Sequence, residues 1–157
     1  MTVQELAKEA LQYYKLKTVT RDSLKVAIWT HTDDAPEWVK EMTRKAHGDM
    51  LPDDWKFRFV VEALEAIADS EEGYEDEAIT ELEADVYNNE LLDWVSSSPI
   101  RMKYVDEAVE KIDEWPGSLA YALGMGQVEE KQQVGWIVLE CLRNRSEIID
   151  VGAETTG

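Results

Sequence analysis

A regular recurrence of apolar residues between positions 53 and 69, DDWKFRFVVEALEAIAD, constrains the fold of this chain more than any other feature. The spacing of three and four residues is that of one face of an α-helix. We therefore expect a helix that buries one side in a core and exposes a mostly acidic side. The buried side would consist of Phe57, Val60, Val61, Leu64, Ile67 and Ala68, and the exposed side of Arg58, Glu62, Glu65 and Asp69.

Other segments with the helical period cover most of the remaining chain. Residues 2–14 have an apolar face, and Thr2 and Glu5 at their start have the spacing of a helix-capping box. A short segment after Ser118 precedes a last helix that contains Val134 and Leu142. Further helices are expected at about 34–48, 74–83, 88–98 and 100–113.

Residues 16–31 are compatible with two structures. Leu24, Val26 and Ile28 alternate as in a strand, whereas Leu24, Ala27 and Ile28 have the spacing of a helix. We favour a short helix that starts at about Ser23.

These segments together predict an all-α fold with about seven to eight mostly short helices. The chain has 157 residues, which is enough for one hydrophobic core without disulfides or metals. No repeat or long linker divides it. We expect a single helical domain over residues 1–150, followed by a flexible tail over 151–157.

Acidic residues are concentrated in the middle of the chain. No Lys or Arg occurs from Phe59 to Ile100, and thirteen carboxylates lie in that window. Helix stability does not require them, because like charges one turn apart, such as Glu77 and Glu81, cost about 0.2–0.5 kcal/mol per pair. The formal net charge of −18 should repel nucleic acids and anionic membranes. It favours a basic protein as partner.

We expect the partner to bind outward-pointing side chains of this acidic window. Tyr74 and Tyr87 would be aromatic anchors among the carboxylates. The expected binding residues are Glu62, Glu65, Asp69, Glu71, Glu72, Tyr74, Glu75, Asp76, Glu77, Glu81 and Tyr87.

Two histidines precede aspartates at the same spacing. His31 and Asp33 form one pair, and His47 and Asp49 form the other. Imidazole nitrogens and carboxylate oxygens can bind a divalent metal if the two loops converge. The alternative is that the aspartates start or cap helices and the histidines lie on the surface. We assign no other cofactor and no catalytic residue.

The chain has the features of a cytoplasmic protein. Its single cysteine, Cys141, cannot form an internal disulfide and suits a reducing compartment. The N-terminal residues do not resemble a signal peptide, and no window has the roughly 20 apolar residues of a membrane span.

Three stretches of the sequence resemble a family of small acidic helical proteins that occur in bacteriophages and bacterial genomes. They are AHGDMLPDDWKFRFVVEALEAIAD, LEADVYNNELLDWVSSS and YVDEAVEK, within residues 45–142. The resemblance implies an all-α fold and a phage or mobile-element origin, and it supplies no activity. The matching positions are His47, Gly48, Asp49, Pro52, Asp53, Trp55, Tyr87, Leu91, Trp94, Tyr104 and Asp106.

We therefore expect a non-enzymatic protein that binds a basic partner, with the role of a nucleic-acid mimic against a host factor as one form of this function. Two alternatives stay open. The first is a small metal-dependent enzyme that uses His31, His47 and neighbouring aspartates. The second is a helical adaptor whose acidic face is inert.

Overall fold

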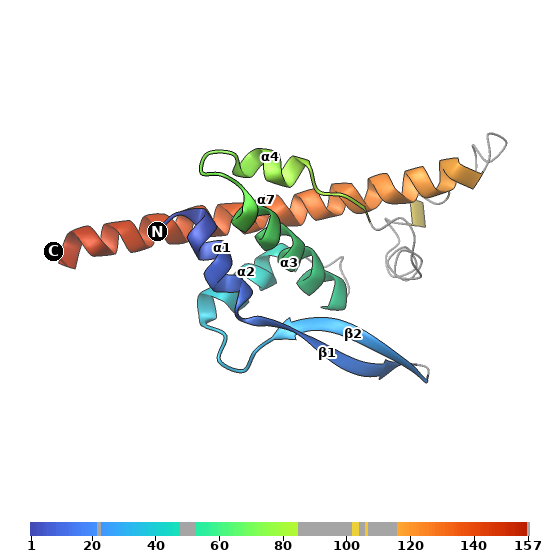
Figure 1. The fold of residues 1–157 in the computed structure, drawn as a ribbon, viewed down its shortest axis with the longest axis horizontal. Coiled ribbons are helices and arrows are strands. Elements are labelled where there is room, and N and C mark those ends of the chain that lie inside the picture. The colour runs from blue at the N-terminus through green and yellow to red at the C-terminus, as the bar shows by residue number, and fades with distance from the viewer. Residues whose placement is uncertain (22, 48–52, 85–101, 104–105, 107–115, 157) are drawn as a thin grey trace.

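The structure, a computed structural model, describes residues 1–21, 23–47, 53–84, 102–103, 106 and 116–156. In these ranges the helices are accompanied by a two-stranded antiparallel sheet (Figure 1), so the prediction of an all-α fold with seven to eight helices is wrong. The elements are α1 (Val3–Leu11), β1 (Tyr14–Arg21), β2 (Leu24–His31), α2 (Glu37–His47), α3 (Asp53–Asp69), α4 (Glu75–Thr80) and α7 (Pro116–Thr156).

The segment with the ambiguous pattern forms a β-hairpin. Tyr14 lies opposite His31, and Arg21 lies opposite Leu24. Ser23 has a φ of 67°, in the left-handed region that tight hairpin turns require. The helix expected from Ser23 is therefore wrong. β-branched threonines and valines on both strands favour extended backbone, and cross-strand pairing stabilises it in a way that the spacing within one segment does not reveal.

The long helix α7 is the element on which the others pack. It has 41 residues, so it is about 60 Å long, and α1, α2, α3 and α4 all contact it (Figure 1). The short segment and the last helix expected after Pro116 are thus one continuous helix. Val134, Val138 and Leu142 of α7 are buried against the other helices.

The apolar face predicted for α3 is confirmed in the core. Val60, Leu64 and Ile67 are fully buried. Each buried side chain of this size contributes about 1.5–3 kcal/mol relative to an exposed one. The capping box of α1 is also confirmed, with Thr2 and Glu5 bonded reciprocally.

Helix α4 approaches α7 closely because α7 has a glycine at the contact. A Cβ on Gly135 would lie 2.8 Å from Cδ1 of Ile79. Ile79 is fully buried at this contact. Gly135 therefore fixes how near α4 lies to α7. No helix in the described ranges is both long and apolar enough to span a membrane.

Candidate functional site

An open groove of about 700 Å³ lies between the second half of α3, helix α4 with the residues that follow it, and α7. Its apolar lining is mostly small, with Ala66, Ala78, Leu82 and Ala84. Six carboxylate residues line it as well, and we call them the groove acids: Glu62, Asp69, Glu71, Glu77, Glu81 and Glu83.

The turn between α3 and α4 brings the acids of the two helices to one groove. The Ser70 hydroxyl donates to the backbone oxygen of Ile67 at 2.6 Å, just beyond the end of α3. Gly73 has a φ of 93°, which glycine adopts without steric cost. The chain can therefore reverse within residues 70–74 and start α4 beside α3.

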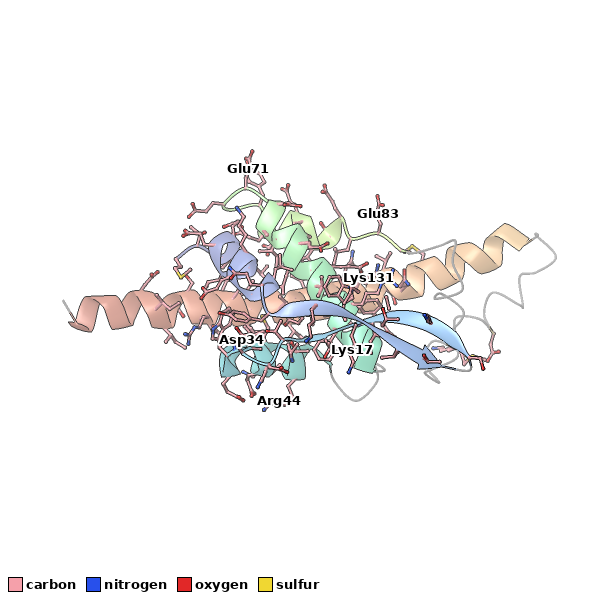
Figure 2. All side chains as sticks on the ribbon, turned by 60° about the horizontal axis from the view of Figure 1, so that its bottom comes forward. Lys17, Asp34, Arg44, Glu71, Glu83 and Lys131 are labelled. Atoms are coloured by element: carbon pink, nitrogen blue, oxygen red, sulfur yellow. The ribbon has the colours of Figure 1, made fainter. Side chains whose placement is uncertain are left out.

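Lys131 of α7 is a buried cation at this groove. It is 2% exposed, and its Nζ lies 2.7 Å from Oε2 of Glu62. The ammonium also donates to the backbone oxygen of Glu83 at 2.9 Å and lies 5.5 Å from the centre of the Phe59 ring. Figure 2 shows Lys131 on α7, with Glu83 on the segment after α4. The ion pair joins α7 to α3, and the hydrogen bond joins α7 to that segment.

Sequence reasoning missed both Lys131 and Glu83. Lys131 stands three residues before Val134 and seven before Val138, so it occupies the apolar stripe of its helix. A lone lysine at such a position was a usable signal, because a buried lysine needs a charged partner.

Most of the predicted binding residues do lie at the groove. Tyr74 lines it and is 53% exposed, as expected for an accessible aromatic side chain. Tyr87 lies outside the described residues. Of the predicted acids, Glu62, Asp69, Glu71, Glu77 and Glu81 line the groove.

Four predicted acids lie elsewhere. Glu65 and Glu72 are exposed outside the lining, and Asp76 pairs with Arg143 at 3.1 Å. Glu75 is 7% exposed, so the expectation that it points outward is wrong. It lies four residues before Ile79 and shares the inner face of α4 with it. The helical phase, rather than the residue type, decides its burial.

Like charges affect the carboxylates of α3. Partial burial at its base raises the pKa of the largely exposed Glu65, and the nearby carboxylates of Glu62 and Asp69 raise it further. In the described part of the chain, Glu62 is the one groove acid in an ion pair, with Lys131 and with Arg58, whose Nε lies 3.6 Å away. The other five groove acids are in no ion pair within the described residues, so the groove would gain from a cation.

The residues predicted to bind a metal do not form a site in the described part of the chain. That part contains no group of three His, Cys, Asp or Glu residues that could hold an ion. His31 Nε2 lies 2.9 Å from the Thr43 hydroxyl, and its ring packs 4.6 Å from that of Phe57. Asp33 is exposed. The His47 side chain and Asp49 lie outside the described part.

His31 belongs instead to a polar link between the hairpin and α2. The Thr43 hydroxyl donates its one proton to the backbone oxygen of Val39 at 3.2 Å. The Tyr14 hydroxyl, at 2.6 Å, and His31 Nε2 must then both donate to Thr43. Burial raises the pKa of the Tyr14 phenol, so the phenol keeps the proton that it donates.

No family model, curated protein or solved structure matches this chain. The resemblance to phage and bacterial proteins is therefore an expectation that rests on the residues quoted above.

Proposed function

We propose that this chain is a non-enzymatic binding protein whose groove accepts a basic segment of a protein partner. The observation that carries the proposal is the groove itself, lined by six carboxylates of which Glu62 alone is paired with a cation in the described part of the chain. A partner would supply the missing positive charges.

The lining of the groove suits lysine and arginine side chains in particular. Their aliphatic stems can lie along apolar surface while the charged head reaches a carboxylate. Ala66, Ala78 and Leu82 offer such surface beside Glu77 and Glu81. The exposed ring of Tyr74 can also stack on a guanidinium or ammonium group.

The hollow shape favours capture of a segment over mimicry of a nucleic acid. A mimic has to present its charges to a basic channel that surrounds it, whereas these carboxylates line a concave surface. We therefore propose segment binding as the primary function. Inhibition of a host nucleic-acid-binding protein, in a chain of phage type, is the particular biological role that this binding would serve.

Binding of a defined probe tests the proposal. A fluorescent lysine- and arginine-rich peptide is titrated against the protein at low and high salt, with a glutamate-rich peptide as the negative probe. We expect the basic peptide to bind and its affinity to fall as salt screens the charges. The variant Glu77→Gln/Glu81→Gln should bind about two- to thirtyfold more weakly, since two exposed ion pairs are worth roughly 0.2–1 kcal/mol each.

The matched control is Glu140→Gln/Glu147→Gln. It removes the same charge from two exposed positions of α7 outside the groove lining. An equal loss of affinity in both variants would show that net charge, and not the groove, attracts the peptide. Binding that is insensitive to salt and to either variant would leave the acidic face as a solubilising surface.

A further inference from the structure

The hairpin has the opposite charge to the rest of the chain. Residues 14–31 contain Lys15, Lys17, Arg21 and Lys25 and a single acid, Asp22, in a protein whose formal net charge is −18. Lys15, Lys17 and Lys25 are exposed, and Leu16 beside them is 57% exposed. The hairpin therefore offers exposed cations on both faces: Lys15 and Lys17 on one, and Lys25 with Leu16 on the other.

In the described part of the chain, this hairpin pairs with no third strand. Two-stranded sheets are marginally stable alone and gain from further contacts. Figure 1 shows the hairpin extending from the helical body on one side of α7, while α4 lies on the other side. The hairpin therefore lies away from the α4 wall of the groove in its own chain.

We infer that the hairpin of one copy docks into the groove of a second copy. This inference rests on the proposed function of the groove and names one basic segment that it accepts. The hairpin supplies what the groove acids lack, namely exposed cations on a segment that pairs with no third strand in the described fold.

The spacing of the charges supports simultaneous pairing. Lys15 and Lys17 lie on one face of β1, about 6.5–7 Å apart along the strand. Glu77 and Glu81 are one turn apart, with the Glu81 backbone nitrogen donating to the Glu77 oxygen at 3.0 Å, so their side chains start about 5–6 Å apart. Two lysines can therefore meet two carboxylates without a change in either backbone.

The length of the hairpin reduces repulsion between two negative copies. A strand of eight residues spans about 26 Å, which exceeds the Debye length of about 8 Å at physiological salt. Two copies can exchange hairpins across a two-fold axis and close a dimer, or copies can add head to tail and form a ring or an open chain.

Charge also argues against two other binding partners for the hairpin, a second hairpin and a nucleic acid. Edge-to-edge pairing of two hairpins would place two cationic ribbons side by side. Nucleic acid would meet the acidic body, which carries more negative charge than the whole chain. Both remain outcomes that the experiment distinguishes.

Sedimentation velocity of the full chain tests the inference at about 0.05 M and about 0.5 M salt. We expect concentration-dependent association at low salt and dissociation at high salt. Lys15→Glu/Lys17→Glu and Glu77→Lys/Glu81→Lys should each abolish association alone. An equimolar mixture of the two should associate again, because each then meets a surface of opposite charge.

The control Lys8→Glu/Lys45→Glu reverses two exposed lysines on α1 and α2 and should associate like wild type. Lys15→Gln/Lys17→Gln provides the same test of the hairpin with a smaller perturbation of folding. The inference is overturned by a wild type that stays monomeric, by a mixture that stays monomeric, or by association that strengthens with salt, as hairpin pairing would. The inference would also be overturned if the hairpin bound a DNA duplex more tightly than it binds a second copy of the chain.

The same variants separate this inference from the proposed function. The hairpin variant keeps its groove, so it should still bind the basic peptide. In the wild-type protein, peptide binding without self-association would overturn the inference alone. Loss of both would overturn the proposed function as well.

Discussion

Lys131 combines nearly complete burial with a full charge, and its partners explain how the fold tolerates it. The Glu62 carboxylate neutralises the ammonium, and the backbone carbonyl of Glu83 accepts a hydrogen bond from it. Since these contacts come from two segments that line the groove, we regard Lys131 as the residue that holds the groove together.

Replacement of Lys131 by Met should destabilise the protein strongly. The change leaves the partly buried Glu62 without its nearest cation, and breaking a buried pair costs about 3–5 kcal/mol, less where a partner keeps some solvent. Urea unfolding followed by tryptophan fluorescence measures the loss. Lys131→Met/Glu62→Gln should lose less than Lys131→Met alone, and exposed Lys45→Met should lose under about 0.5 kcal/mol. A double variant less stable than the single one would contradict this account.

Glu65 gives a pH-dependent prediction. Its pKa is raised in the folded state, so the folded protein holds this proton more tightly than the unfolded chain does, and stability falls as pH rises through the raised pKa. Glu65→Gln cannot ionise. It should be more stable than wild type at pH 7 by roughly 0.2–0.5 kcal/mol per like-charged neighbour, and the difference should vanish below about pH 4.3.

Urea unfolding at the two pH values checks this, with the exposed Glu72→Gln as the matched control that should change little. A Glu65→Gln variant that is less stable than wild type at pH 7 would mean that the carboxylate makes a favourable contact instead of a repulsive one.

Single residues also show where sequence reasoning succeeds at the site. The concentration of acids in the acidic window led to a correct prediction of five of the six groove acids. It succeeded because the helical period of α3 is clear and the short helix α4 follows directly after it. The prediction failed for Glu75. A charged residue was expected to be exposed, but the position of Glu75 along α4 places its side chain on the buried face with Ile79. It failed for Lys131 because a partner far along the chain decides whether a lysine can be buried.

At the scale of elements, one threonine of α2 is hydrogen-bonded to both strands of the hairpin. Thr43 of α2 accepts hydrogen bonds from Tyr14 of β1 and His31 of β2. The Phe57 ring of α3 packs edge-on against both of these rings. This contact joins the base of the hairpin to two helices.

Thr43→Val should loosen the hairpin more than the rest of the fold. The change keeps the volume but leaves the buried Tyr14 hydroxyl without its acceptor, which costs about 1–3 kcal/mol. Hydrogen exchange measured by mass spectrometry should accelerate in residues 14–31 and change little in α3. Exposed Thr18→Val on β1 is the control and should stay within about 0.5 kcal/mol of wild type. Equal acceleration in both regions would show that the link serves global stability only.

The elements divide clearly into those that local pattern predicts and those that it does not. α1 and α3 follow from their periodicity and, for α1, its cap, because both signals lie within one segment. The hairpin depends on pairs up to seventeen residues apart, such as Tyr14 with His31. A helical period can occur by chance in β1 and β2, so the pattern alone did not separate the two structures.

At the scale of the whole molecule, negative charge opposes the compact state. A net charge of −18 makes the folded protein repel itself, and salt screens that repulsion. We expect the melting temperature to rise between about 0.02 M and about 0.5 M NaCl. Differential scanning fluorimetry measures it, and Glu71→Gln/Glu72→Gln should show a smaller rise. A fall with salt would show that exposed ion pairs outweigh repulsion.

The long helix α7 has a consequence for synthesis on the ribosome. Helices α1 to α4 all rest on it, and its buried residues Val134, Val138 and Leu142 lie far along the chain. The earlier helices also contact one another, so their apolar faces are only partly covered while they leave the exit tunnel, and the core closes only after residue 142 has emerged. Until then the nascent chain has to rely on its own negative charge, or on a chaperone, to avoid aggregation.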